Sequence, residues 1–133
     1  MPDTARTLQQ ERAAKAWEKV QEIEQGGNKG FQKEYGSLVR GLPAMILQNG
    51  LAQSVAFLSA KGGTNLAEVH SVVLRHLTEG VRTRLAIPEA QEMLPWLLNQ
   101  STPRYRLAAS ESLAFLHWLK RFVEAKDWRS EEK

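Results

Sequence analysis

Residues 35–61 read YGSLVRGLPAMILQNGLAQSVAFLSAK, which is the pattern of two helices in succession. Apolar side chains recur at helical steps in both halves, so each half places them along one side of a helix. They are Leu38, Leu42, Met45 and Ile46 in the first half, and Leu51, Val55 and Leu58 in the second. Between the halves, Asn49-Gly50 offers the left-handed backbone conformation in which helices often end. Helices with apolar faces are unstable alone in water, so we expect the remaining chain to cover them.

Pro43 lies inside the first of these helices. Proline lacks a backbone donor, and its ring crowds the carbonyl four residues earlier. The sequence therefore predicts either a kink at this position or a fresh helical start with Gly41-Leu42 as the joint. We expect the first helix to span residues 31–49 and the second to span residues 51–60, before Gly62-Gly63.

The flanking segments predict four more helices, each with its own boundary signals. Thr4 is the expected cap of a helix over residues 5–25, and residues 26–30 form a flexible connection without helix-forming residues. Asn65 and Glu68 have the spacing of a capping box for a later helix. That helix is expected to end before a turn at residues 82–87.

The last two helices are predicted from proline positions and from a long apolar stripe. Pro88 suits the first position of the fifth helix, and Pro95 makes that helix short or bent. The sixth helix is expected over residues 104–125, and the polar segment 125–133 is expected to fray.

The predicted core positions of these four helices share helical spacing. They are Leu8, Ala16, Val20 and Ile23; Leu66, Val69, Val73, Leu77 and Val81; Met93, Leu94, Trp96, Leu97 and Leu98; and Ala108, Ser112, Phe115, Leu119 and Phe122. No stretch alternates apolar and polar residues as strands do. The sequence therefore predicts an all-α fold, a compact bundle of five to six helices in one domain over residues 1–133.

Length and composition exclude several classes of protein. A chain of 133 residues buries about 68–70% of its unfolded surface, which is enough for a core without covalent staples. The absence of cysteine excludes disulfides, thiolate metal sites and cysteine nucleophiles. No apolar run approaches the roughly 20 residues of a membrane span, and the N-terminus lacks the apolar core of a signal peptide. We therefore expect a soluble, cytoplasmic protein.

The charge is mildly basic and unevenly distributed. The chain has 18 Lys and Arg residues against 15 Asp and Glu residues. Residues 35–88 are locally cationic, because they hold five basic residues against only Glu68 and Glu79. This balance is compatible with a nucleic-acid partner but does not by itself indicate one.

The sequence lacks the patterns of known catalytic and metal sites. Its Asp residues, Asp3 and Asp127, lie at opposite ends, and its three histidines have no metal-binding spacing. No phosphate-binding loop or nucleophile elbow is present. We therefore expect a protein without catalytic residues, metal or cofactor. A metal-independent ribonuclease with His70 and His117 as base and acid is the remaining enzymatic alternative.

The four tryptophans fall mostly at core spacing, which favours packing over base stacking. Two of them are exceptions. Trp118 lies at the border of the last helix's apolar face, and Trp128 lies in the polar tail. Either one is a candidate for an interface.

Two long patterns make the chain recognisable. The first, LPxxIxxNGLxQxxAFxxxK, comprises Leu42-Pro43, Ile46, Asn49-Gly50-Leu51, Gln53, Ala56-Phe57 and Lys61. The second, YRxxxxExLxFLxWLKRFxEA, comprises Tyr105-Arg106, Glu111, Leu113, Phe115-Leu116, Trp118-Leu119-Lys120-Arg121-Phe122 and Glu124-Ala125. Together with residues 9–16, they resemble the small helical subunit of the Cmr complex, the fifth Cmr protein family of type III-B CRISPR–Cas effectors. Ser110 stands where the family often has Thr, and residues 62–100 match only loosely.

The resemblance implies an all-helical, non-catalytic subunit with a part in antiviral defence. Members of that family stack along the middle of a filament, beside the backbone subunits that hold the guide RNA. The implied partners are the other Cmr subunits, further copies of the same chain, and the guide and target RNA. Within such a complex, base pairing reads the sequence while protein charge holds the duplex.

Five cations are the candidates for phosphate contacts, and they are Arg40, Lys61, Arg106, Lys120 and Arg121. The alternative is a helical adaptor that stabilises the assembly without touching RNA, with Lys120 and Arg121 meeting a neighbouring subunit. The two differ in one feature. A continuous strip of these cations favours RNA, whereas cations paired with Glu111 or Glu124 favour the adaptor.

Overall fold

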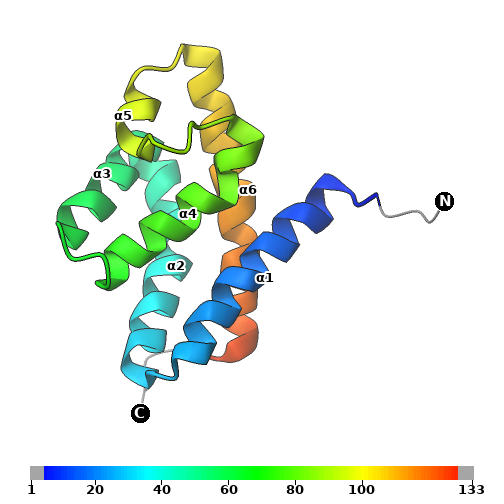
Figure 1. Cartoon of the computed structure of the whole chain (residues 1–133), viewed down its shortest axis with the longest axis vertical. Helices are drawn as coiled ribbons and strands as arrows, with labels where there is room; N and C mark the ends of the chain where they lie inside the picture. The colour runs from blue at the N-terminus through cyan, green and yellow to red at the C-terminus, as the bar shows by residue number, and fades with distance from the viewer. Residues whose placement is uncertain (1–4, 129–133) are drawn as a thin grey trace.

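The computed structural model describes residues 5–128 and consists of six helices (Figure 1). They are α1 (Leu8–Gly26), α2 (Lys29–Asn49), α3 (Leu51–Gly62), α4 (Val69–Leu85), α5 (Met93–Leu98) and α6 (Thr102–Lys126). The described residues contain no strand. The predicted all-α fold of five to six helices is confirmed.

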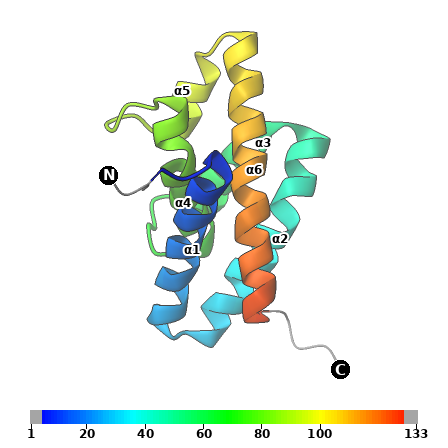
Figure 2. The same cartoon turned by 90° about the vertical axis from the view of Figure 1, so that its right-hand side faces the viewer.

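The long helix α6 packs against α1, α2 and α4 and forms one wall of the molecule (Figure 2). It runs in the same direction as α1, since Arg12 pairs with Glu111 near one end and Glu24 pairs with Lys126 at the other. Helix α4 crosses the middle of the molecule between α3 and α6 (Figure 1). The short helix α5 packs on α3. The core therefore lies around α4 and the inner face of α6.

The helix pair of residues 35–61 forms as the sequence predicts. Gly50 has φ 88° and ψ 162°, a conformation open to glycine and strained for other residues, and it separates α2 from α3. The apolar stripe is buried at Leu42, Ile46, Leu51, Val55 and Leu58. Helix α2 is continuous through the buried Pro43, so the alternative of a fresh helical start at Gly41-Leu42 is wrong.

The first helix begins later than the sequence predicted. Thr7 caps α1 through a complete capping box with Gln10, so residues 5–7 precede the helix, and Thr4 lies outside the described residues. The expected flexible connection at residues 26–30 is much shorter, because Asn28 already caps α2 by accepting from the Phe31 N–H.

The region around α4 and α5 differs most from the prediction. Glu68, rather than Asn65, caps α4, and Leu66 is 83% exposed instead of buried. The expected turn at residues 82–87 is helical as far as Leu85. Pro88 does not open a helix, since α5 begins only at Met93. Of the expected core residues in α5, Leu98 is exposed, while Met93, Trp96 and Leu97 are buried.

The last helix is longer than predicted and the chain after it is packed. Ser101 caps α6 by accepting from the Arg104 N–H, and the helix continues to Lys126. Trp128 is only 9% exposed, and its ring lies edge-on to that of Tyr35 with the ring centroids 6.4 Å apart. The expected fraying of residues 125–128 is therefore wrong, and residues 129–133 lie outside the described range. Trp128 is a core residue, not part of an exposed interface.

Gly80 is required where α4 crosses α6. A Cβ added at Gly80 would lie 2.3 Å from Cζ of Phe115, so Gly80→Ala forces the ring or the helix to move. We expect this substitution to lower the free energy of unfolding by about 1–2 kcal/mol, because overpacking outweighs the better helix propensity of alanine. Denaturant unfolding at neutral pH measures the change.

Gly41→Ala is the matched control for Gly80→Ala. Gly41 is also inside a helix, but a Cβ there meets no atom within 4 Å. The control is expected to stabilise the protein by up to about 1 kcal/mol. Equal unfolding free energies for the two variants would contradict the packing argument.

None of the described helices is both long and apolar enough to cross a membrane.

Candidate nucleic-acid interface

The outer face of α6 carries three of the five cations that the sequence singles out. Arg106 and Arg121 are exposed, and Lys120 is half-buried. Arg106 and Arg121 are separated by fifteen residues of one helix, which corresponds to roughly 22 Å along its axis. Within residues 5–128, none of the three side chains has an ion-pair partner. Their charges are therefore available to a partner.

The cations form two groups rather than an unbroken strip. The uncharged side chains of Ser110 and Leu113, together with His117, lie between Arg106 and the Lys120-Arg121 pair. The pairing expected of an adaptor is also absent, since Glu111 pairs with Arg12 instead. The cations of α6 therefore form neither the continuous strip predicted for RNA binding nor the pairs with Glu111 or Glu124 predicted for an adaptor.

The other two candidate cations lie apart from this face. Lys61 is exposed in the last turn of α3, where the neighbouring Gly62 packs against Ser71 of α4. The opposite end of α3 meets α6, because the Ala52 N–H donates to the Tyr105 hydroxyl at 2.8 Å. Lys61 is therefore not brought together with the cations of α6.

Arg40 has a structural partner. It is half-buried, and its Nη1 donates to the Trp128 carbonyl at 2.8 Å. This bond holds the segment after α6 against α2, so the guanidinium already has one role inside the fold.

A groove between α1 and α6 adds residues that the sequence did not suggest. It is lined by Gln9, Arg12, Ala114, His117, Trp118 and Arg121. The Trp118 Nε1–H donates to Gln9 Oε1 at 3.3 Å, and the indole lies against Phe122 with ring centroids 5.6 Å apart. The groove thus places an aromatic ring beside Arg121.

Arg12 and Glu111 fix the position of α1 on α6. The guanidinium binds the carboxylate with two bonds, Nε to Oε2 at 2.8 Å and Nη2 to Oε1 at 2.7 Å. The Glu111 side chain is only 4% exposed, and Arg84 of α4 lies 3.8 Å from it. The hydrogen bond to Glu111 raises the pKa of Arg12. The pair therefore joins α1 and α6 beside the groove, with α4 close by.

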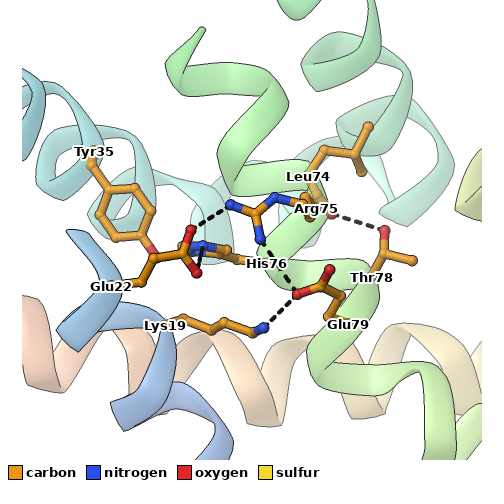
Figure 3. Close-up of polar contacts among 8 residues, drawn as sticks. All are labelled: Lys19, Glu22, Tyr35, Leu74, Arg75, His76, Thr78 and Glu79. Atoms are coloured by element: carbon orange, nitrogen blue, oxygen red, sulfur yellow. Dashed lines mark hydrogen bonds and ion pairs between the residues drawn. The ribbon is translucent and has the colours of Figure 1, made fainter. Parts of the chain in front are cut away.

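A second polar network joins α1, α2 and α4 (Figure 3). Glu22 of α1 binds Arg75 at 2.5 Å and lies 3.3 Å from Nε2 of the buried His76, while Lys19 binds Glu79. The Tyr35 hydroxyl is 2.8 Å from His76 Nδ1. Because Nε2 faces a carboxylate, the arrangement favours a proton on Nε2 and an accepting Nδ1. Within this structural network His76 and Tyr35 are buried, whereas Glu22, Arg75 and Glu79 reach the surface. The sequence analysis missed the network.

Burial governs the ionisation of the groups in this network. Burial lowers the pKa of His76 to about 4, and it raises the pKa of Tyr35 far above the usual range. Burial also acts to raise the pKa of Glu22, but the hydrogen bonds and charges of Arg75 and His76 together outweigh it and the pKa is lowered. His76 and Tyr35 are therefore neutral at pH 7 while Glu22 is charged.

The two histidines of the ribonuclease alternative line different hollows. His70 lies between α2 and α4 with Nδ1 2.8 Å from Glu68 Oε2, and His117 lies in the groove between α1 and α6. The two hollows share no lining residue. In the part of the chain that the structure describes, no group of three His, Cys, Asp or Glu side chains is placed to hold a metal ion.

Comparison with known proteins agrees with the resemblance in the sequence. The sequence profile of the CRISPR-associated protein family Cas_Cmr5 matches residues 8–126, which include all six helices. The chain belongs to the Cas_Cmr5 family. Its relatives include two proteins named "CRISPR system Cmr subunit Cmr5". The one from Thermus thermophilus is 34% identical over 122 residues, covering 90% of this chain and 96% of the relative. The one from Thermotoga maritima is 33% identical over 121 residues, covering 90% and 84%.

A solved structure agrees with the family assignment. The crystal structure of a CRISPR-associated Cmr5 family protein from Thermus thermophilus superposes with a TM-score of 0.72 and 30% identity. The match covers 90% of this chain and 97% of that one, so the Cas_Cmr5 fold extends through the loosely matching residues 62–100 as well.

Proposed function

We propose that this chain is the non-catalytic small subunit of a type III-B CRISPR RNA-guided effector, the Cmr complex, and acts in antiviral defence. It stacks beside other subunits and further copies of itself, and it helps to hold guide and target RNA by contacts with phosphate. Family membership supports the first part of the proposal. The unpaired cations on the outer face of α6 support the second.

The gathering of cations without ion-pair partners on one face of α6 is the observation on which the RNA contact rests. By contrast, Arg12, Lys19, Arg75 and Lys126 each bind a carboxylate of the fold. Arg106, Lys120 and Arg121 have none, so phosphates meet charges that no carboxylate of residues 5–128 neutralises. Such contacts position a nucleic acid without reading its sequence, which suits a complex in which base pairing supplies the specificity.

Catalysis has no part in this proposal. The separation of His70 and His117 supports a binding role, since general acid and base must reach one phosphate. The chain has a net charge of only +3, so we expect weak RNA affinity in isolation and stronger binding where several copies line one channel. Sub-micromolar, sequence-specific binding by the isolated chain at physiological salt would contradict this.

Replacing Arg106, Lys120 and Arg121 by glutamine tests the phosphate contacts. Each lost phosphate contact removes roughly 0.7–0.9 from the slope of log K against log salt, so the triple variant is expected to lower the slope by about two units. The salt slope is measured by fluorescence anisotropy with labelled single-stranded RNA, at salt concentrations from about 25 to about 200 mM.

The control is the same change at Lys15, Lys29 and Lys33, which likewise lack ion-pair partners among residues 5–128. It removes the same net charge from other surfaces, so a nonspecific charge effect would alter both slopes equally. If the α6 variant keeps its salt slope but no longer co-purifies with the other Cmr subunits, the face is a protein interface and the adaptor is correct.

A further inference from the structure

We propose that the groove between α1 and α6 receives one unpaired nucleobase of single-stranded RNA, stacked on the indole of Trp118. The inference rests on the proposed function and deepens it, because it assigns a base-binding position beside the phosphate contacts. The groove is lined by side chains from both helices, namely Gln9, Arg12, Ala114, His117, Trp118 and Arg121.

The indole of Trp118 is held in place but only partly covered. Phe122 lies against it with ring centroids 5.6 Å apart and planes tilted by 34°, and Trp17 in turn packs edge-on to Phe122 at 5.1 Å. The bond from Nε1 to Gln9 fixes the rotation of the ring. The side chain is half-buried, so part of the ring remains accessible. A rigid, partly exposed indole is a suitable stacking platform, since little entropy is lost when a base covers it.

Ala114 leaves room over this platform. Side chains on a helix lean toward its N-terminus, so the indole of Trp118 reaches back toward the residue four positions earlier. That residue is Ala114, which lines the groove. Its methyl group is the smallest side chain of the groove lining, so it takes up little of the space into which the indole reaches.

The charge of the groove favours an anionic ligand. None of the lining residues is acidic, and Arg121 has no ion-pair partner within residues 5–128. By contrast, the hollow between α2 and α4 contains Glu34 and Glu68, and the one beside α5 contains Glu79, Glu89 and Glu92. A phosphate at Arg121 therefore meets no repelling carboxylate in the groove.

The lining favours a nucleotide over a protein segment. Its surface is mixed, since Trp118 and Ala114 lie among polar side chains, so the choice rests on charge: the groove holds two arginines and no carboxylate. The Gln9 Oε1 at the rim already accepts from Trp118 and from Arg12, but its amide nitrogen is able to donate to a base edge. A stacking ring, an amide and a free guanidinium form the usual set for recognition of an unpaired nucleotide.

The test follows the indole N–H resonance of Trp118 in the full chain by NMR, assigned through its loss in Trp118→Phe. The probes are a short single-stranded oligoadenylate at low salt and an abasic ribose-phosphate oligomer of equal length and charge. We expect the oligoadenylate to shift this resonance and the abasic oligomer to leave it in place. We also expect Trp118→Ala to weaken oligoadenylate binding about tenfold and Trp118→Phe to retain most of it.

Two variants serve as matched controls. Leu107→Ala removes a large exposed apolar side chain from the same helix, outside the groove lining, and is expected to change affinity less than twofold. Ala114→Leu keeps Trp118 but fills the space beside it, and is expected to weaken binding as Trp118→Ala does. Circular dichroism and the spectra of the free proteins establish that each variant is folded.

The outcomes separate this inference from the proposed function. If the backbone amides of Arg106 and Arg121 shift with RNA while the Trp118 indole does not, the phosphate face stands and the base site is wrong. If neither shifts at low salt, both proposals fail. If the Trp118 resonance shifts with protein concentration alone, the groove binds a second copy of the chain, and the base site is overturned.

Discussion

Replacing Arg12 by alanine is expected to lower the free energy of unfolding by about 3–5 kcal/mol, because it leaves a buried carboxylate without its partner. Arg12 supplies both hydrogen bonds to Glu111, whose side chain is 4% exposed. The remaining cation, Arg84, has its Nε 3.8 Å away, beyond hydrogen-bond distance, and its own side chain is 53% exposed. Arg84 therefore compensates only in part, and denaturant unfolding at neutral pH measures the loss.

Three further variants show whether the cost comes from the orphaned carboxylate. Arg6→Ala removes an exposed arginine just before α1 and is expected to change stability by less than about 0.5 kcal/mol. Arg12→Lys keeps the charge but not the two parallel bonds, and should fall between wild type and Arg12→Ala. Arg12→Met combined with Glu111→Leu is expected to recover most of the stability, because an apolar pair removes the buried charge altogether.

The double variant decides the interpretation. If Arg12→Met with Glu111→Leu is as unstable as Arg12→Ala, the lost stability reflects packing of α1 rather than the carboxylate. The same variants bear on the groove, because Gln9 and Arg12 belong to the first two turns of α1. A looser α1 would move Gln9 away from Trp118 while the cations of α6 stay in place.

Local signals in the sequence were sufficient to predict the helix pair at the centre of the fold. Residues 35–61 formed the expected helix pair because the apolar period and the Asn49-Gly50 break are local signals, each contained within a few residues. The prediction failed where two local signals compete. Asn65 is a preferred cap and Glu68 is not, and both side chains accept backbone N–H groups, but the helix starts after Glu68.

Long-range contacts explain the errors around Pro88 and the C-terminus. Arg82 of α4 donates to the Pro88 carbonyl and so holds residues 88–92 in a non-helical turn. Arg40 of α2 likewise donates to the Trp128 carbonyl, and the Tyr35 ring packs edge-on against the Trp128 indole. The sequence around Trp128 is polar and therefore predicts a solvated tail. No neighbouring residue in the chain indicates that α2 will pack against Trp128.

The candidate site was predictable on α6 but not on α1. The outward positions of Arg106 and Arg121 follow from helical period alone. The groove needs Gln9 and Arg12 from a helix almost one hundred residues away, and this proximity is not encoded locally. One signal was available, since Arg12 precedes the buried Ala16 by one helical turn and therefore lies beside the apolar stripe of α1. A cation at that position indicates a buried acidic partner on another helix.

Acidification from pH 6.5 to pH 5 is expected to lower the free energy of unfolding by about 1.5 kcal/mol through His76 alone. Burial lowers the pKa of this histidine to about 4 in the folded protein, whereas its ordinary value is 6.5. Between these values the unfolded chain binds a proton that the folded protein does not. Stability therefore rises with pH across this window and is lost as the pH falls.

The acidic partners of His76 do not obscure this window. The pKa values of Glu22 and Glu79 are lowered from 4.5, so their own contributions are lost only as the pH falls below about 4.5. Denaturant unfolding at half-unit steps from pH 6.5 to pH 5 thus isolates the histidine. His76→Gln is expected to abolish most of the slope, since an amide takes up no proton. The same change at the exposed His117 is expected to leave the slope in place.

A wild-type measurement covers the case in which His76→Gln does not fold. The His76 ring resonance, followed by NMR through the same pH range, should remain that of neutral imidazole down to pH 5. The physical reason is geometric. Tyr35 donates its hydroxyl proton to Nδ1, and burial keeps that hydroxyl protonated by raising its pKa far above the usual range, so protonating His76 takes away the acceptor of the Tyr35 O–H inside the core. Glu22 favours the protonated ring from 3.3 Å, but it is 45% exposed and partly neutralised by Arg75, so desolvation prevails. A ring that titrates near pH 6.5 in the folded protein would show that the carboxylate outweighs burial.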